Sequence, residues 1–231
     1  YLFLLFFCFN NIYNIYIKKN LNIYLVVIIT LLGLLLSGSR AALIIGILLI
    51  LLFVKAPKRK VIYYLAIGIL FYFAFKSMLF QDNLLKRYQV GHSIGDQSSG
   101  RNMLIVELIQ GDYESPHFLY GGGQGYSRTI SRNIGMEIRN FEYPIIMFAY
   151  DYGILTTLLI YYIILIFPLT RFIHNKDYFL LVHFLSIFIY INTNNGLNNF
   201  SDTMASLCFV FMLMINLSEL DEPNEIDDSI E

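Results

Sequence analysis

The chain has 231 residues, of which 57% are hydrophobic, 16% are aromatic and only 14% are charged. Its formal net charge is −1, so its overall charge does not favour binding to nucleic acid, and we expect no such partner. This apolar composition lies outside the range of ordinary soluble domains and predicts a polytopic membrane protein.

The first segment is apolar from its start and has neither the basic flank nor the cleavage site of a signal peptide. It therefore predicts a membrane span. Because the first residue is Tyr1, we expect the chain to be the C-terminal part of a longer protein. Cys8 and Cys208 each lie inside an apolar run, which favours hydrophobic packing over disulfide or zinc chemistry.

Seven apolar stretches predict seven membrane-spanning helices, each near or below the roughly 20 residues needed to cross a bilayer. The predicted fold is therefore an all-α transmembrane bundle over residues 1–218, with a partly helical external loop at 81–140. The predicted spans are residues 1–17, 21–36, 41–54, 61–80, 142–167, 178–191 and 203–217.

Half of the Lys and Arg residues lie in three short connectors, at 18–19, 55–60 and 171–176. Alternating spans place these connectors on one face, which the positive-inside rule identifies as cytoplasmic. The opposite face then receives residues 37–40, the loop 81–140 and the turn 192–202. The acidic segment 219–231 reads as a solvated cytoplasmic tail.

The second and third predicted spans are separated only by Ser37–Arg40. A guanidinium group between two membrane helices is energetically costly, which makes Arg40 a functional-site candidate. The broken backbone at this joint also needs water or protein around it, because hydrocarbon offers no hydrogen bonds. The alternative is that Arg40 only extends its side chain to lipid headgroups.

Two elements stand out in the external loop, which carries six basic and six acidic residues. Residues 101–110 follow Ser99 and Gly100 with helical apolar spacing, and so predict a short capped amphipathic helix on the membrane, ending at Gly111. Arg101 either faces a ligand or only anchors this helix. The glycine-rich segment Gly121–Gly125 can direct amide groups at an anion or let a substrate approach the main chain, although it also fits a flexible loop.

In chain order these elements resemble the bacterial O-antigen ligase/polymerase family. Such proteins combine an S-x-S-R element opening a span, an external loop with an S-G-R element and a later G-x-G, and a catalytic residue eleven positions before a Gly-Ile or Gly-Leu pair. The resemblance covers about residues 25–170. The matching residues are Ser37–Arg40, Ser99–Arg101, Gly121–Gly125, and Glu142 with Gly153–Ile154.

Ligase-like members carry His-Asn where this chain has Glu142–Tyr143, whereas polymerase-like members often carry a carboxylate. The resemblance therefore implies a metal-independent glycosyltransferase that polymerises oligosaccharide repeat units linked to polyprenyl diphosphate, as for O-antigen, capsule or exopolysaccharide. It implies no cofactor, an active face on the outer side of the bacterial inner membrane, and membrane lipids, a flippase and a chain-length regulator as partners.

The residue types suit this chemistry. Arg40 and Arg101 can pair diphosphate oxygens bidentately as the lipid diphosphate leaves. Glu142, at the predicted membrane boundary, can accept the proton of the attacking sugar hydroxyl. Each also has a structural interpretation, and Glu142 fits an ordinary first-turn acid that interacts with the helix dipole. We further expect substrate contacts from Ser39, Gly121, Gly123, Gly125, Arg128 and Tyr143.

Other residues are weaker candidates. Asp151 lies within the predicted span 142–167, where we expect it to be buried in the bundle and either to pair with another helix or to line the acceptor cavity. His92 and His117 could act as bases but do not occupy the family position. The acidic residues of the external loop are scattered singly, so we expect no metal site.

Two other functions remain open. An O-antigen ligase would transfer the glycan to a lipid or protein acceptor. A transporter or flippase of lipid-linked sugar would place polar residues near the midplane, in interrupted helices related by an internal repeat, and no repeat is visible in the sequence. A non-catalytic sensor would leave the Arg and Glu residues unexplained.

Overall fold

The computed structural model describes residues 2–16, 22–37, 40–53, 101–111, 115–133, 141, 143–193 and 202–220, and the single positions 68, 72, 76 and 89. Every regular element in this part of the chain is a helix, which confirms the predicted all-α class there. The chain forms two compact units, Tyr1–Ile109 and Gln110–Glu231, and each is described by itself.

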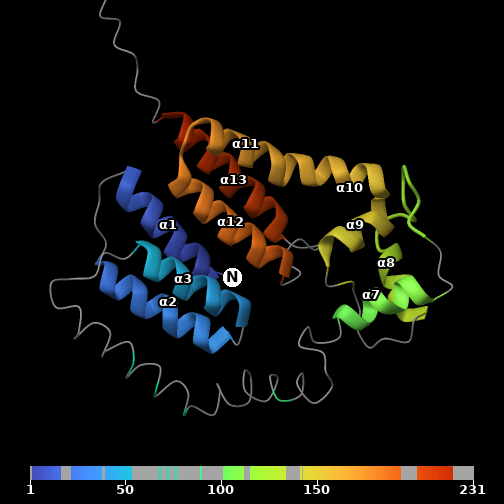
Figure 1. Ribbon diagram of the computed structural model, residues 1–231, viewed down its shortest axis with the longest axis horizontal. Coiled ribbons are helices and arrows are strands. Elements are labelled where there is room, and N and C mark those ends of the chain that lie inside the picture. Colours follow the sequence, from blue (N-terminus) through green and yellow to red (C-terminus); the bar gives the residue numbers. More distant parts are fainter. Residues whose placement is uncertain are drawn as a thin grey trace, which may run out of the picture. The chain divides into compact units, whose positions relative to one another are not determined.

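The first unit contains three apolar helices that pack side by side, α1 (Leu2–Tyr16), α2 (Ile23–Ser37) and α3 (Arg40–Phe53) (Figure 1). The start of α1 packs against the C-terminal half of α2. The ring of Phe3 on α1 occupies the space that a side chain at Gly33 on α2 would need. Leu34 fills the corresponding space beside Gly46 of α3. Small residues thus let these helices approach closely. The observed bounds agree with the first three predicted apolar segments, and whether these helices span a membrane stays a prediction.

Helix α7 (Arg101–Gln110) forms where the sequence predicts the short loop helix, with the predicted end before Gly111. Whether α7 lies on a membrane surface stays a prediction. Of the predicted span 61–80, all but positions 68, 72 and 76 lie outside the described residues.

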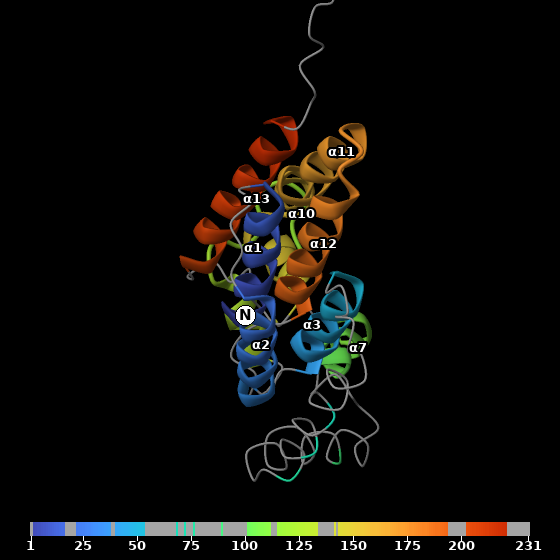
Figure 2. The same ribbon diagram turned by 90° about the vertical axis from the view of Figure 1, so that its left-hand side faces the viewer.

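The second unit begins with two short helices, α8 (Tyr126–Asn133) and α9 (Pro144–Tyr152). A longer rod follows, made of α10 (Ile154–Tyr161), the π-helical turn η2 (Tyr162–Ile166) and α11 (Phe167–His174). Helices α12 (Tyr178–Thr193) and α13 (Asp202–Leu220) pack beside α11 (Figures 1 and 2).

Aromatic rings form the centre of this second packing. The ring of Phe184 on α12 lies 5.4 Å from that of Phe172 on α11 and 4.7 Å from that of Phe211 on α13, measured between centroids. All three side chains are buried. Edge and tilted contacts of this kind add to the free energy gained by burying apolar area.

The predicted span 142–167 is wrong at both ends. The helix is interrupted at Gly153, whose φ of 90° and ψ of 161° are incompatible with helical geometry. The continuous helix runs instead over Ile154–His174, passing Pro168. Proline lacks an amide hydrogen and its ring crowds the carbonyl four residues earlier. The wider π turn just before Pro168, closed by the Phe167 amide bonding to the Tyr162 carbonyl, accommodates the ring.

Ile154–His174 has 21 residues and is long and apolar enough to cross a membrane by length and composition. At roughly 1.5 Å per residue it measures about 31 Å, close to the hydrocarbon thickness of a bilayer. Five further apolar helices in the described part of the chain are shorter, so the count of seven spans stays a prediction.

Candidate functional site

The segment 115–125, which contains the glycine-rich residues, docks against the break between α9 and α10. The start of a helix leaves amide groups without intrahelical partners. Here the Ile154 amide donates to the His117 carbonyl over 3.2 Å, and the Leu155 amide donates to the Phe118 carbonyl over 2.9 Å. The loop therefore supplies the acceptors that the first turn of α10 lacks.

The same segment completes the other side of the break. The Gly122 amide donates to the Tyr150 carbonyl over 2.8 Å, and the Gly123 amide donates to the Asp151 carbonyl over 2.9 Å. These are carbonyls at the end of α9, which have no partner within their own helix. Both helix ends are thus sealed by main-chain groups of one loop.

Glycine is required at two points of this junction. Gly121 has a φ of 61°, and a Cβ atom there would lie 2.6 Å from the main-chain carbonyl of Asp151. Gly153 has a φ of 90°, and its Cβ atom would lie 2.6 Å from the carbonyl carbon of Leu119. Both the left-handed backbone and the close approach exclude a side chain.

Asp151 connects this junction to α8. Its side chain is only 1% exposed, and its carboxylate accepts the Ser127 amide over 2.7 Å and the Gly125 amide over 3.2 Å. Ser127 lies in the first turn of α8, where a negative charge also interacts favourably with the helix dipole. The prediction that Asp151 is buried and paired is confirmed, and its partner is the start of α8.

This geometry changes the interpretation of the glycine-rich segment. The amides of Gly122, Gly123 and Gly125 all donate within the protein, so they are not available to a substrate phosphate. The anion that two amides of the region do bind is the chain's own Asp151 carboxylate. A Cβ atom at Gly123 or Gly125 would meet open space, so a substrate could come close to the main chain there. The predicted substrate role of these two glycines now depends on that close approach.

The predicted catalytic set is described only in part. Glu142 and Ser39 lie outside the described residues. Arg40 and Arg101 are the first residues of α3 and α7, but their side chains also lie outside the described part. Both arginines belong to the first unit and Glu142 to the second, so the convergence of the three stays a prediction.

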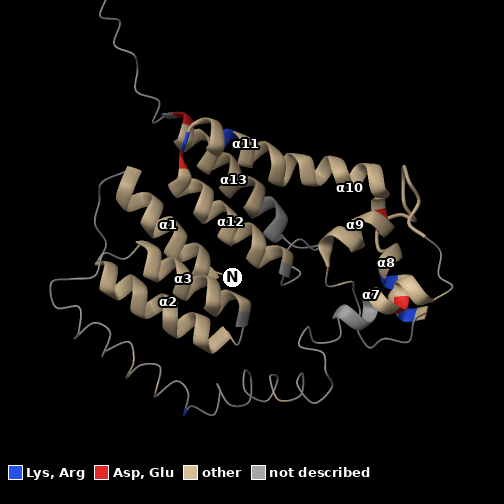
Figure 3. Cartoon of the chain, in the orientation of Figure 1, with Lys and Arg blue, Asp and Glu red and all other residues tan. Residues whose placement is uncertain are grey.

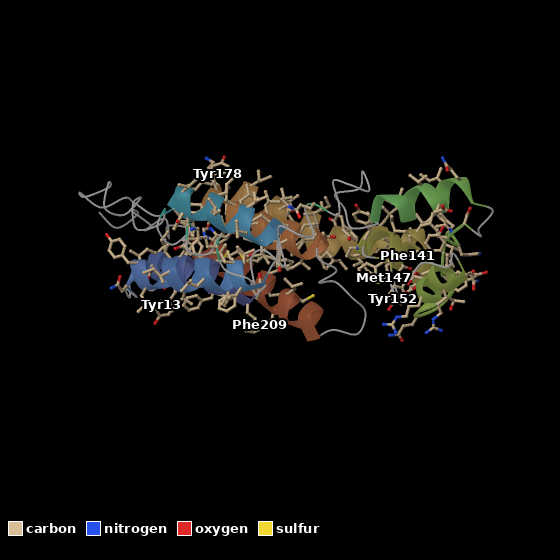
Figure 4. The ribbon with its side chains drawn as sticks, turned by 90° about the horizontal axis from the view of Figure 1, so that it is seen from below. Tyr13, Phe141, Met147, Tyr152, Tyr178 and Phe209 are labelled. Atoms are coloured by element: carbon tan, nitrogen blue, oxygen red, sulfur yellow. The ribbon has the colours of Figure 1, made fainter. Side chains whose placement is uncertain are left out.

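The residues on either side of position 142 are described. Phe141 is fully buried, with its ring edge-on to that of Tyr150 at 5.3 Å between centroids. Tyr143, a predicted substrate contact, is partly exposed and immediately precedes α9 in extended conformation. Figure 4 shows Phe141, Met147 and Tyr152 gathered along α9. Packing of Phe141 thus fixes where the chain enters α9.

Two arginines lie one turn apart on α8. Arg128, predicted to bind substrate, is partly exposed, and Arg132 is exposed. Residues four apart share a helix face. The sequence analysis missed Arg132 because the spacing becomes informative only once residues 126–133 are known to be helical. Guanidinium groups are suited to phosphate oxygens, so this face of α8 could bind a diphosphate.

His117 has a defined environment. Its ring stacks on that of Tyr120 with centroids 3.6 Å apart, and its Nδ1 accepts the Leu119 amide over 3.3 Å. Within the described ranges, no group of three or more His, Cys, Asp or Glu side chains is placed to hold a metal ion. The described site therefore consists of a sealed helix break, a buried carboxylate and two arginines on a short helix.

Comparisons with protein-family models, with curated proteins and with solved structures gave no match for this chain.

Proposed function

We propose that the chain is part of a membrane-embedded, metal-independent glycosyltransferase that polymerises oligosaccharide repeat units carried on polyprenyl diphosphate. The proposed reaction transfers the glycan from its lipid diphosphate to a hydroxyl group of another lipid-linked unit. The new glycosidic bond replaces the bond to the diphosphate, Glu142 accepts the hydroxyl proton, and the lipid diphosphate leaves against arginine side chains.

The exposed surface of the helix Ile154–His174 supports a membrane location. Its side chains on one broad face are large, apolar and open to the surroundings, which in water would be an unusual and unfavourable patch. The sequence from 154 to 170 contains no charged residue. The exposed apolar residues include Leu155, Leu158, Leu159, Tyr162, Ile163, Ile166, Phe167 and Ile173.

The observation that carries the proposal is where the glycine-rich segment docks. It lies at the first turn of the one described helix that is long and apolar enough to cross a bilayer, and α8 is held there by Asp151. In Figure 3 the coloured charged residues of this unit lie on α8, at the junction of α9 and α10, and around the end of α11, with an uncharged stretch between. With the long helix in the membrane, as proposed, the arginines of α8 would lie near the phosphates of a lipid-linked substrate.

The helix break at Gly153 also bears on the transporter alternative. In transporters, the ends of interrupted helices face the substrate or the coupling ion. Here the carbonyls of Tyr150 and Asp151 and the amides of Ile154 and Leu155 bond to the loop instead. The main-chain groups at this break are thus already paired within the protein, which favours the enzyme over the transporter.

The test is replacement of the proposed base and of one proposed arginine in cells that make the protein. We expect Glu142→Gln to lower the polymerisation rate roughly 10²- to 10⁴-fold, because the amide cannot accept the hydroxyl proton. The Arg40→Lys variant should also lose polymerisation, since an ammonium group cannot pair bidentately with the diphosphate oxygens. The measurement is glycan chain length, together with the membrane face on which lipid-linked units accumulate.

Matched controls come from the far end of the second unit. Arg171→Lys and Glu219→Gln make the same chemical changes at an exposed pair 3.8 Å apart, and both should leave long chains intact. Single units accumulating on the outer face would support the polymerase. Accumulation on the cytoplasmic face would identify a flippase instead, and normal chains from both test variants would reject the proposed mechanism.

A further inference from the structure

We propose that Phe118, Leu119 and Tyr120 form a membrane-interface anchor, which inserts into the boundary between phospholipid headgroups and acyl chains. This inference depends on the membrane location in the proposed function, but not on the polymerase reaction.

The three side chains are open although they are large and apolar. Phe118 is 58% exposed, Leu119 53% and Tyr120 68%. Three consecutive residues with this exposure are costly in water. The segment 115–125 contains no Asp, Glu, Lys or Arg, so no charge opposes its entry into the interface. Tyrosine is also among the residues enriched at membrane–water boundaries.

Two hydrogen bonds fix the position of this anchor along the helix Ile154–His174. The Phe118 carbonyl accepts the Leu155 amide, and the Leu119 carbonyl accepts the Thr156 hydroxyl over 3.3 Å. The anchor is therefore continuous with the first exposed residues of that helix, Ile154 and Leu155. If the 21 residues of the helix cross the hydrocarbon, its first turn and the anchor lie at the boundary.

The backbone of the anchor is held firmly enough to present its side chains. Tyr120 stacks on His117, and Gly121 packs against the main chain of Asp151. The next residues lead through the glycine-rich segment into α8, where the Asp151 carboxylate receives the Ser127 amide. An anchor at residues 118–120 thus also sets how far α8, with Arg128, stands from the lipid phosphates.

The absence of tryptophan from the chain allows a direct test. Phe118→Trp and Tyr120→Trp each introduce a single indole, which is excited selectively over the 18 tyrosines, into the chain reconstituted in phosphatidylcholine vesicles. Bromines attached near the headgroup end of the acyl chains quench indoles that lie at the interface. We expect both variants to be quenched more strongly by lipids brominated at carbons near the headgroup than by lipids brominated near the chain ends.

Two further single-tryptophan variants serve as references. Gln124→Trp lies in the same segment at an exposed position beyond the anchor and should be quenched much less. Ile163→Trp lies on the exposed face near the middle of the long helix and should be quenched best by bromines near the chain ends. Circular dichroism checks that each variant keeps its helical content.

Each pattern of quenching across the four tryptophan positions tests a separate part of the proposal. Quenching at position 163 without quenching at 118 and 120 would reject the anchor while leaving the membrane helix intact. Absence of quenching at all four positions would reject the membrane helix, and the proposed function with it. Quenching of 124 equal to that of 118 would mean that the whole segment is immersed, which would contradict an anchor limited to residues 118–120.

Discussion

Asp151 joins three parts of the second unit through one side chain and its adjoining backbone. Its carboxylate binds the start of α8, its main-chain carbonyl binds the Gly123 amide, and it belongs to the last turn of α9. Hydrogen bonds to an ionised acceptor contribute about 1.5–3 kcal/mol each, more than neutral ones. The position of α8 therefore depends on the charge of Asp151.

Replacing Asp151 by asparagine should loosen α8 while keeping the side-chain size. The amide nitrogen would face a main-chain N–H group, so one hydrogen bond is lost and the other loses its charge. We expect local opening of residues 121–133 to become roughly 10- to 100-fold more frequent, corresponding to about 1.5–3 kcal/mol. Hydrogen–deuterium exchange of this segment measures the change.

Asp177→Asn is the matched control, because the Asp177 side chain also accepts a main-chain amide at the start of a helix, that of Leu180 over 3.0 Å at α12. Exchange should rise in the first turn of α12 and stay unchanged at 121–133. Equal protection of 121–133 in the Asp151→Asn variant and the original chain would show that the carboxylate does not hold α8.

At the scale of elements, the break between α9 and α10 tests how much of the site depends on glycine. Gly153 and Gly123 have nearly equal φ angles, 90° and 92°. They differ in surroundings, since a Cβ atom at Gly153 meets the Leu119 backbone and one at Gly123 meets open space. Gly153 also has a ψ of 161°, a conformation open almost only to glycine, so its alanine variant combines backbone strain with steric overlap, whereas the Gly123 variant adds no overlap.

Gly123→Ala should cost only the strain of a left-handed residue, about 1–2 kcal/mol. Gly153→Ala adds the displacement of segment 117–120, so we expect a clearly larger loss of unfolding free energy. Denaturant titration of the protein in detergent, followed by circular dichroism, compares the two. Equal losses would mean that the close approach of Leu119 contributes nothing to stability.

The sequence predicts helices well here and predicts contacts between them poorly. Apolar runs identify α1 to α3, and the Ser99–Gly100 signal identifies the start of α7. Apolar residues continue on both sides of Asp151 and Gly153, so hydropathy alone merges α9 and α10. The partner that stabilises the break lies some 30 residues earlier, and no local pattern reports a contact at that separation.

The candidate site, too, was predictable from the sequence only in part. Burial of Asp151 follows from its place in an apolar run, whereas its bonds to Gly125 and Ser127 depend on tertiary structure. The glycine-rich segment is a visible motif, but the motif does not reveal that its amides are consumed within the protein. The predicted roles of Glu142, Arg40 and Arg101 stay predictions.

Considered as a whole, the second unit has the charged residues of α8 to α12 near the two ends of the helix Ile154–His174. Arg171 pairs with Glu219, and Asn175 donates to the Ser218 hydroxyl over 2.7 Å, both at the end of α11. The proposed orientation, which follows the positive-inside rule, puts this end in the cytoplasm. The glycine-rich segment then belongs to the outer side.

Cysteine labelling tests this orientation. With Cys208, which is exposed, replaced by serine, and Cys8 left buried, an impermeant reagent applied to intact cells reports only on introduced thiols. Gln124→Cys should be modified and His174→Cys should be spared until the membrane is opened. Modification of His174→Cys alone would reverse the assignment, and modification of both would show that the helix does not separate the two positions.

The sealed break at Gly153 has a consequence for the order of assembly. During synthesis, residues 117–123 leave the ribosome before α9 and α10 do. The four backbone groups at the break, from Tyr150, Asp151, Ile154 and Leu155, therefore meet a partner segment that already exists. A cut between residues 123 and 144 would leave both halves present but untether them. The long helix would then enter the bilayer with its first amides unpaired, a defect of biogenesis rather than of chemistry.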